Sequence, residues 1–173
     1  MTRWMLGAVA LLAATFSMTP AMADESANSA GDQLFPELIT VDGDSKPVHP
    51  AIGEGKWTLV MLWATTCHIC EIDKPLFSKF HEKHKDGNIE VFGIAIDGHQ
   101  KLPSVQRYLA ARDVSFPNSV GEFLTVGSSL INIAEEPLRG TPTYLLFDPE
   151  GEIKGVHAGH LAPDKVEVFI ASN

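Results

Sequence analysis

The apolar positions of the chain alternate between short continuous runs and helical stripes. Residues 57–63 and 89–96 are apolar almost throughout, as strands buried on both faces of a sheet are. Between these runs, apolar side chains recur at helical spacing from residue 72 to residue 80, and Pro75 is expected to kink this helix. A second helical pattern covers residues 102–112.

Three further segments have weaker patterns. Residues 38–41 predict a short strand that ends in a turn at Asp42-Gly43-Asp44. Residues 114–120 predict another short strand. Residues 121–138 have no sustained period, and we interpret them as an irregular or partly helical central insertion.

The C-terminal part predicts a hairpin followed by a helix. Residues 143–147 and 153–158 are expected to pair around a turn at residues 148–151, and Pro163 is expected to start the last helix. Its inward face is expected to carry Val166, Phe169 and Ile170. Strand–helix–strand repeats require a parallel centre, whereas a hairpin adds antiparallel strands. The sequence therefore predicts an α/β fold with a mixed central sheet and helices on both faces.

The N-terminus has the pattern of a secretory signal peptide. Arg3 precedes an apolar stretch of residues 5–16, and Ala21-Met22-Ala23 supplies the small residues of a cleavage site. We predict a signal peptide over residues 1–23, cleaved after Ala23, which directs the chain to the periplasm. An uncleaved membrane anchor is the alternative. Residues 24–33 are small and polar and are interpreted as a flexible leader, so the folded domain is expected to span residues 34–173.

The charge balance excludes two classes of partner. The chain has 173 residues with a formal charge of −9, and removal of residues 1–23 also removes Arg3, which leaves −10. Such a surface repels nucleic acid and anionic lipid. We therefore expect no nucleic-acid partner and no stable membrane insertion after the signal peptide is cleaved.

The cysteines carry the candidate chemistry. The chain has two, and both lie in Cys67-His68-Ile69-Cys70. A bridge across two residues closes almost no loop and adds little stability, so this pair is better explained as a reagent. Cys67 follows a predicted strand and starts a predicted helix, whose N-terminus favours a thiolate. We expect the Cys67 thiolate to attack a substrate disulfide, and Cys70 to release the mixed disulfide that results.

Metal sites and peroxidase chemistry are weaker alternatives. Structural zinc needs four ligands, and no second Cys-x-x-Cys exists. Two thiolates suit Cu(I), so a copper chaperone remains an alternative, as does copper shared with His157 or His160. A peroxiredoxin-type site would have Pro and Thr or Ser where Val60 and Ala64 stand. We predict no bound metal and no cofactor beyond the Cys67–Cys70 disulfide.

Four motifs together resemble the thioredoxin family. Trp63-Ala64-Thr65-Thr66-Cys67-His68-Ile69-Cys70 resembles its active-site segment, and Gly140-Thr141-Pro142-Thr143 resembles its cis-proline loop. Residues 35–48 and 148–153 resemble the opening and the hairpin of the TlpA/ResA branch. The resemblance covers residues 34–171 and implies a thioredoxin-like fold with an N-terminal extension and a central insertion.

The same resemblance implies an exported thiol–disulfide oxidoreductase. In the TlpA/ResA branch this is often a reductase of exported proteins, for example in cytochrome c or metalloprotein maturation. Its electrons would come from a membrane donor of the DsbD or CcdA type, and its partners are exported protein thiols and disulfides. A net oxidant or isomerase is the alternative.

The sequence departs from the family at residues that modulate the site. Thr66 replaces the usual Trp, Met61 replaces the buried acid of thioredoxin, and Asp73 replaces a Glu of the TlpA-like branch. His68, if protonated, favours the thiolate and makes the couple more oxidising, or else it is an exposed bystander. Ile69 adds an apolar rim. The residues expected to modulate the site or dock substrate are Trp63, Thr66, His68, Ile69, Asp73, Thr141 and Pro142.

Overall fold

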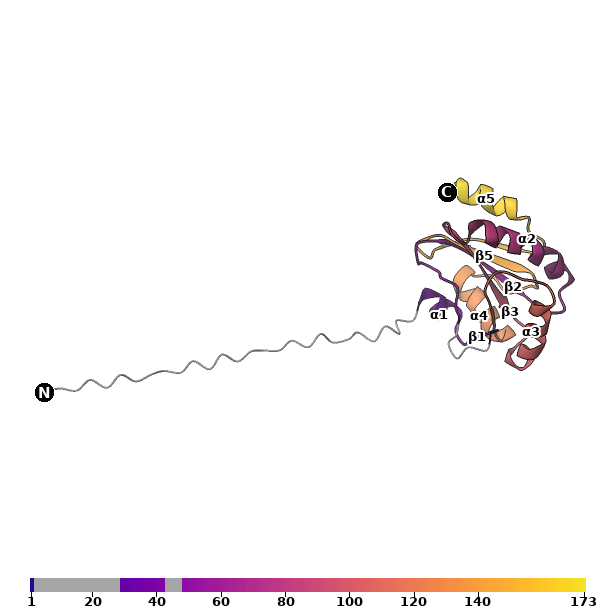
Figure 1. Ribbon diagram of the computed structural model, residues 1–173, viewed down its shortest axis with the longest axis horizontal. Coiled ribbons are helices and arrows are strands. Elements are labelled where there is room, and N and C mark those ends of the chain that lie inside the picture. The colour runs from indigo at the N-terminus through magenta and orange to yellow at the C-terminus, as the bar shows by residue number, and fades with distance from the viewer. Residues whose placement is uncertain (2–28, 43–47) are drawn as a thin grey trace.

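The computed structural model describes Met1, residues 29–42 and residues 48–173. Within these residues, six strands form one sheet in the order β1-β4-β3-β2-β5-β6 (Figure 1). The strands are β1 Ile39–Thr40, β2 Trp57–Trp63, β3 Ile89–Ala95, β4 Asn118–Val120, β5 Thr143–Phe147 and β6 Ile153–Ala158. The predicted signal peptide, most of the predicted leader and most of the Asp42-Gly43-Asp44 turn lie outside the described residues.

The sheet is mixed, as predicted. β2 pairs with β3 in parallel, and β3 pairs with β4 in parallel. β5 runs antiparallel to β2 on its other side, and β6 closes the hairpin with β5. β2 is therefore the central strand, which explains why every one of its residues is buried.

Helices cover both faces of the sheet (Figure 1). They are α1 Ala30–Leu34, α2 His68–His84, α3 Leu102–Ala110, α4 Phe123–Ala134 and α5 Pro163–Ala171, with a short 3-10 helix at His99–Lys101. Alternate residues of β2 point to opposite faces. Met61 packs in a core cluster with α2, α3 and α5, whereas Leu62 packs in a second cluster with residues of α4 and the segment after α1. The fold class predicted from the sequence is thus confirmed.

The central insertion is more regular than predicted. Residues 123–134 form α4, a continuous helix. Val126 and Leu130 are spaced by one turn and are buried against the sheet. Phe123, Leu124 and Ile131 are exposed on the same helix. These outward apolar side chains hid the helical period, because the sequence shows no polar face opposite the buried one.

The predicted leader is wrong at its C-terminal end. Residues 30–34 form α1, which begins with a capping box between Ser29 and Asp32. Gly31 is buried against the backbone of Pro50, where a side chain would not fit. The folded domain therefore begins before residue 34.

Smaller differences concern strand lengths and the last helix. The two strands predicted at residues 38–41 and 114–120 shorten to β1 and β4. In α5, Val166 is buried as predicted, but Phe169 is 38 % exposed and meets the Trp57 ring edge-on. In the part of the chain that the structure describes, no helix combines the length and apolarity needed to cross a membrane.

Candidate active site

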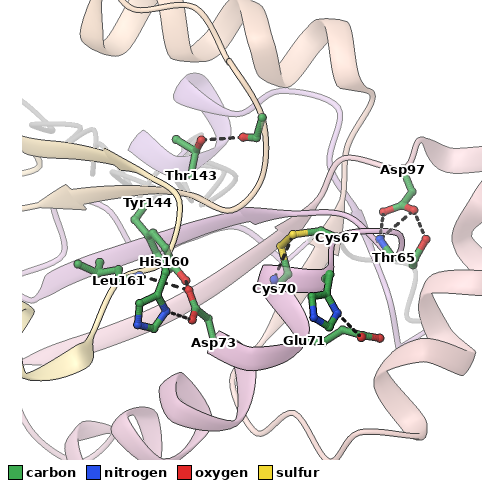
Figure 2. The surroundings of a disulfide bond; sticks show 12 residues. Thr65, Cys67, Cys70, Glu71, Asp73, Asp97, Thr143, Tyr144, His160 and Leu161 are labelled. Carbon is green, nitrogen blue, oxygen red and sulfur yellow. Dashed lines mark hydrogen bonds and ion pairs between the residues drawn. A yellow bond between two sulfur atoms is a disulfide. The ribbon is translucent and has the colours of Figure 1, made fainter.

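The two cysteines are joined in a disulfide at the N-terminus of α2 (Figure 2). Cys67 is the N-cap residue, and its Sγ accepts the backbone N–H of Cys70 at 3.1 Å. β2 ends at Trp63, so only three residues separate the central strand from Cys67. The helix therefore presents its unpaired N–H groups and positive dipole end to Cys67.

The two sulfurs differ in accessibility. Cys67 is partly exposed, whereas Cys70 is fully buried. A thiolate at Cys67 would lie partly exposed at the helix N-terminus, whose unpaired N–H groups and positive dipole end stabilise a negative charge. Cys67 is thus placed to attack an incoming disulfide, and Cys70 to attack the mixed disulfide from within.

The predicted cis peptide bond at Thr141–Pro142 is confirmed. Thr143 begins β5 and pairs with Leu62 near the end of β2. Because these strands are antiparallel, the start of β5 and the end of β2 meet at one edge of the sheet, the edge that carries Cys67. Thr141 is partly exposed beside the buried Pro142. The expected role of both residues in docking substrate stays a prediction.

Asp97 fixes the segment that leads into the cysteines, and the sequence reasoning missed it. Its carboxylate accepts the backbone N–H of Thr65, at 3.1 Å for each oxygen, and also the Thr65 hydroxyl (Figure 2). β2 and β3 are parallel with Trp63 opposite Ala95, so Thr65 and Asp97 each lie two residues beyond the last pair. The sequence did contain a signal for Asp97, because an acid shortly after a buried parallel strand lies at the edge of the sheet that carries the cysteines.

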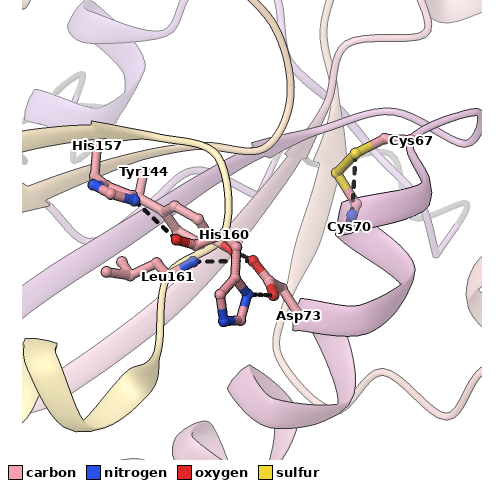
Figure 3. Close-up of polar contacts among 7 residues, drawn as sticks. All are labelled: Cys67, Cys70, Asp73, Tyr144, His157, His160 and Leu161. Carbon is pink, nitrogen blue, oxygen red and sulfur yellow. Dashed lines mark hydrogen bonds and ion pairs between the residues drawn. A yellow bond between two sulfur atoms is a disulfide. The ribbon is translucent and has the colours of Figure 1, made fainter.

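Asp73 lies one turn after Cys70 and is fully buried. It accepts three hydrogen bonds: from the Tyr144 hydroxyl at 2.7 Å, from the backbone N–H of Leu161 at 3.3 Å, and from Nδ1 of His160 (Figure 3). Burial, and then the Asp73 carboxylate, raise the pKa of Tyr144, so the phenol remains a donor. The sequence identified Asp73 but neither of its side-chain partners.

Lys74, the next residue on α2, is a second buried ionisable group that the sequence reasoning missed. It is 1 % exposed, and its Nζ has no hydrogen-bond partner among the described residues. The amine lies 3.0 Å from the centre of the Trp63 ring and 4.2 Å from that of Tyr108. Burial, helped by the nearby Arg112 charge, lowers the pKa of Lys74 to about 6.

A signal for Lys74 was present in the helical pattern. Cys70, Lys74 and Phe77 are spaced by four and three residues, so they share the buried face of α2. A lysine in that stripe contradicts the ordinary preference for surface positions. Trp63 is held in place below the amine by a 2.9 Å hydrogen bond from its Nε1 to Asn118.

The predicted surface residues around the disulfide are exposed. Thr66 is open to solvent, Ile69 is 40 % exposed, and the side chain of His68 is 84 % exposed. Nδ1 of His68 lies 3.6 Å from a carboxylate oxygen of Glu71. A salt bridge to Arg112 holds the pKa of Glu71 low. Any positive charge on His68 therefore lies near a carboxylate and is screened by water.

Two histidines that were considered as copper ligands have other contacts. Nδ1 of His160 bonds Asp73, and Nε2 of His157 bonds the backbone carbonyl of His160 at 2.9 Å (Figure 3). Among the described residues, no three His, Cys, Asp or Glu side chains are grouped to hold a metal ion.

Comparisons with known proteins agree on one kind of chemistry. The family model described as the AhpC/TSA family matches residues 32–156. Over 148 residues the chain is 29% identical to thiol-disulfide oxidoreductase ResA of Halalkalibacterium halodurans, covering 86% of this chain and 79% of that protein. A second ResA, from Oceanobacillus iheyensis, is 22% identical and covers 94% of this chain and 82% of that protein.

Solved structures resemble the whole domain. A thioredoxin-family thiol:disulfide interchange protein from Chlorobium tepidum superimposes with a TM-score of 0.66 at 23% identity, covering 78% of this chain and 89% of that one. A putative thioredoxin from Neisseria meningitidis gives a TM-score of 0.62 at 25% identity, covering 78% and 85%. These structures bear out the thioredoxin-like fold.

Proposed function

The chain belongs to the AhpC/TSA family and is a thioredoxin-like, ResA-type thiol–disulfide oxidoreductase, and on that premise we propose that it is an exported reductase of protein disulfides acting through Cys67 and Cys70. The observation that carries the proposal is the unequal exposure of the two sulfurs at the N-terminus of α2. An exposed sulfur beside unpaired N–H groups is a nucleophile, whereas a buried one is reached from within the protein.

The reaction begins with the reduced protein. The Cys67 thiolate attacks one sulfur of the substrate disulfide, the substrate S–S bond breaks, and a mixed disulfide forms. Cys70 then attacks Cys67, which releases the second substrate thiol. Two electrons pass from the cysteine pair to the substrate, and the protein is left with the Cys67–Cys70 disulfide seen in the structure.

The surroundings of His68 support reduction over net oxidation. A histidine that strongly stabilised the Cys67 thiolate would make the couple oxidising. His68 instead projects into solvent near Glu71, so its effect on the sulfur is small. His68 therefore does little to shift the couple toward oxidants.

Export and an electron donor complete the proposal. The signal-peptide pattern of residues 1–23 supports a periplasmic location. Because that compartment is oxidising, a reductase there needs a supply of electrons, for which a membrane dithiol donor of the DsbD or CcdA type is the expected source.

Two serine variants test the assignment. The wild-type protein is expected to catalyse the reduction of insulin by dithiothreitol. Cys67→Ser is expected to abolish this catalysis. Cys70→Ser is expected to accumulate a mixed disulfide with the substrate, visible by mass spectrometry and lost on reduction. Preferential alkylation of Cys70 by iodoacetamide in the reduced wild-type protein would reverse the roles, and an active Cys67→Ser variant would refute the proposed chemistry.

A further inference from the structure

Lys74 lies on the same buried face of α2 as Cys70. It lies four residues after Cys70, and residues at this spacing are neighbours on a helix surface, with Cβ atoms roughly 5–6 Å apart. Long helical side chains lean toward the helix N-terminus. The Lys74 amine follows this rule, since it reaches Trp63, the last residue of β2 before the loop to Cys67.

Among the described residues, no carboxylate forms a hydrogen bond with this amine. Burial is the largest effect and lowers the pKa of Lys74, the charge of Arg112 also lowers it, and those of Asp97 and Glu71 raise it. Glu71 pairs with Arg112, and Asp97 holds Thr65. The rings of Trp63 and Tyr108 also contact the amine. Burying an ammonium ion is unfavourable, and a buried amine without a counter-ion gives up its proton instead.

Reduction changes this balance because it creates a negative charge on the same helix face. We propose that Lys74 takes up a proton when the Cys67–Cys70 disulfide is reduced, so that the reduced protein pairs a Lys74 ammonium with a cysteine thiolate. This inference rests on the proposed exchange chemistry. Lys74 acts here as a positioning residue that stabilises the thiolate.

The protons and electrons balance with a dithiol donor. Two electrons from the donor break the Cys67–Cys70 bond, and the donor becomes a disulfide. One of its two protons goes to the Cys70 thiol and the other to Lys74, while Cys67 remains a thiolate. When the protein later reduces a substrate disulfide, the proton on Cys70 and the proton on Lys74 pass, through solvent, to the two product thiols. The net charge of the pair is zero before and after.

Asp73, the residue before Lys74 on α2, differs from it because its side chain is fully hydrogen-bonded. Its two oxygens accept three hydrogen bonds, from Tyr144, His160 and Leu161. These donors bond both of its oxygens. Lys74 is the buried ionisable neighbour of Cys70 that lacks a hydrogen-bond partner among the described residues, and its charge is therefore free to follow the redox state.

The direct test is the pKa of Lys74 in each redox state. Lysine labelled with ¹³C at Cε is titrated by NMR in the oxidised and reduced wild-type protein, and the signal is assigned by its loss in Lys74→Met. The oxidised protein is expected to show a pKa of about 6. Reduction is expected to raise it by about one unit or more, the shift that a nearby opposite charge produces. An equal pKa in both states would overturn the proposal.

Two sets of variants separate this inference from the proposed function. In Cys67→Ser/Cys70→Ser, no thiolate forms, so Lys74 is expected to keep the pKa of the oxidised state. In Lys74→Met, thiolate absorbance at 240 nm is expected to show a Cys67 pKa about one unit higher than in wild type. Lys79→Met, an exposed change on the same helix, is the matched control and should leave that pKa unchanged. An active Cys67→Ser protein would instead refute the proposed function, whatever the lysine titration shows.

Discussion

Replacing Lys74 with methionine is expected to stabilise the disulfide form of the protein. The pKa of Lys74 falls from 10.5 to about 6 on folding, mainly through burial. At pH 7 the unfolded chain therefore binds one more proton than the folded protein at this site. Each pH unit between 7 and 10.5 corresponds to about 1.4 kcal/mol. Burying the lysine therefore lowers the free energy of unfolding by about 5 kcal/mol at pH 7.

The buried amine is mostly neutral at pH 7, so the rings of Trp63 and Tyr108 meet no full positive charge there. The cost of the lysine therefore stays at about 5 kcal/mol at this pH. Methionine fills a similar volume without a charge, and its sulfur packs well against aromatic rings. The free energy of unfolding of Lys74→Met should exceed that of wild type by this amount.

The pH dependence gives the sharper test. A base with a lowered folded pKa makes stability rise with pH between the folded and unfolded values. The advantage of Lys74→Met should therefore be greatest and constant below pH 6, fall by about 1.4 kcal/mol per unit above it, and vanish near pH 10.5. Urea denaturation of the oxidised proteins at pH 6, 7, 8 and 9 measures it, with Lys79→Met as control. A difference that does not change with pH, or a wild type more stable than Lys74→Met at pH 7, would refute the reasoning.

Two further changes probe the other neighbours of the disulfide. Tyr144→Phe removes a 2.7 Å hydrogen bond from the buried Asp73 carboxylate, and urea denaturation is expected to show a loss of about 1–3 kcal/mol; a loss below about 0.5 kcal/mol would mean that water replaces the phenol. His68→Ala is expected to lower the reduction potential by about 20 mV or less in a glutathione titration, because a contact this exposed is weak. A fall much larger than that would show that His68 drives the protein toward oxidation.

The sequence predicted the sheet well because its central strands are buried on both faces. β2 and β3 are continuous apolar runs that match their predicted positions to within one residue. The strand-to-helix junction at Cys67 followed directly from the end of β2. The insertion was harder, since α4 exposes Phe123 and Leu124 and so lacks an amphipathic pattern.

The sequence also identified the residues of the site better than their partners. Cys67, Cys70 and the cis bond before Pro142 carry local motifs. The partners of Asp73 are 71 and 87 residues away along the chain, at Tyr144 and His160. Such contacts depend on how α2 packs on β5 and on the loop after β6. No spacing rule within one segment reveals them.

Two adjacent residues of α2 thus place different ionisable groups beside the buried cysteine. Asp73 turns toward β5 and the loop after β6, where three donors bond its oxygens. Lys74 turns toward Trp63 and Tyr108, where no hydrogen-bond partner among the described residues fixes its charge. When reduction adds a thiolate, only the group without a fixed partner responds by changing protonation. A residue that lowers the stability of the oxidised form then stabilises the reduced form, and its pKa in that form sets the pH range over which the reduced protein keeps its thiolate.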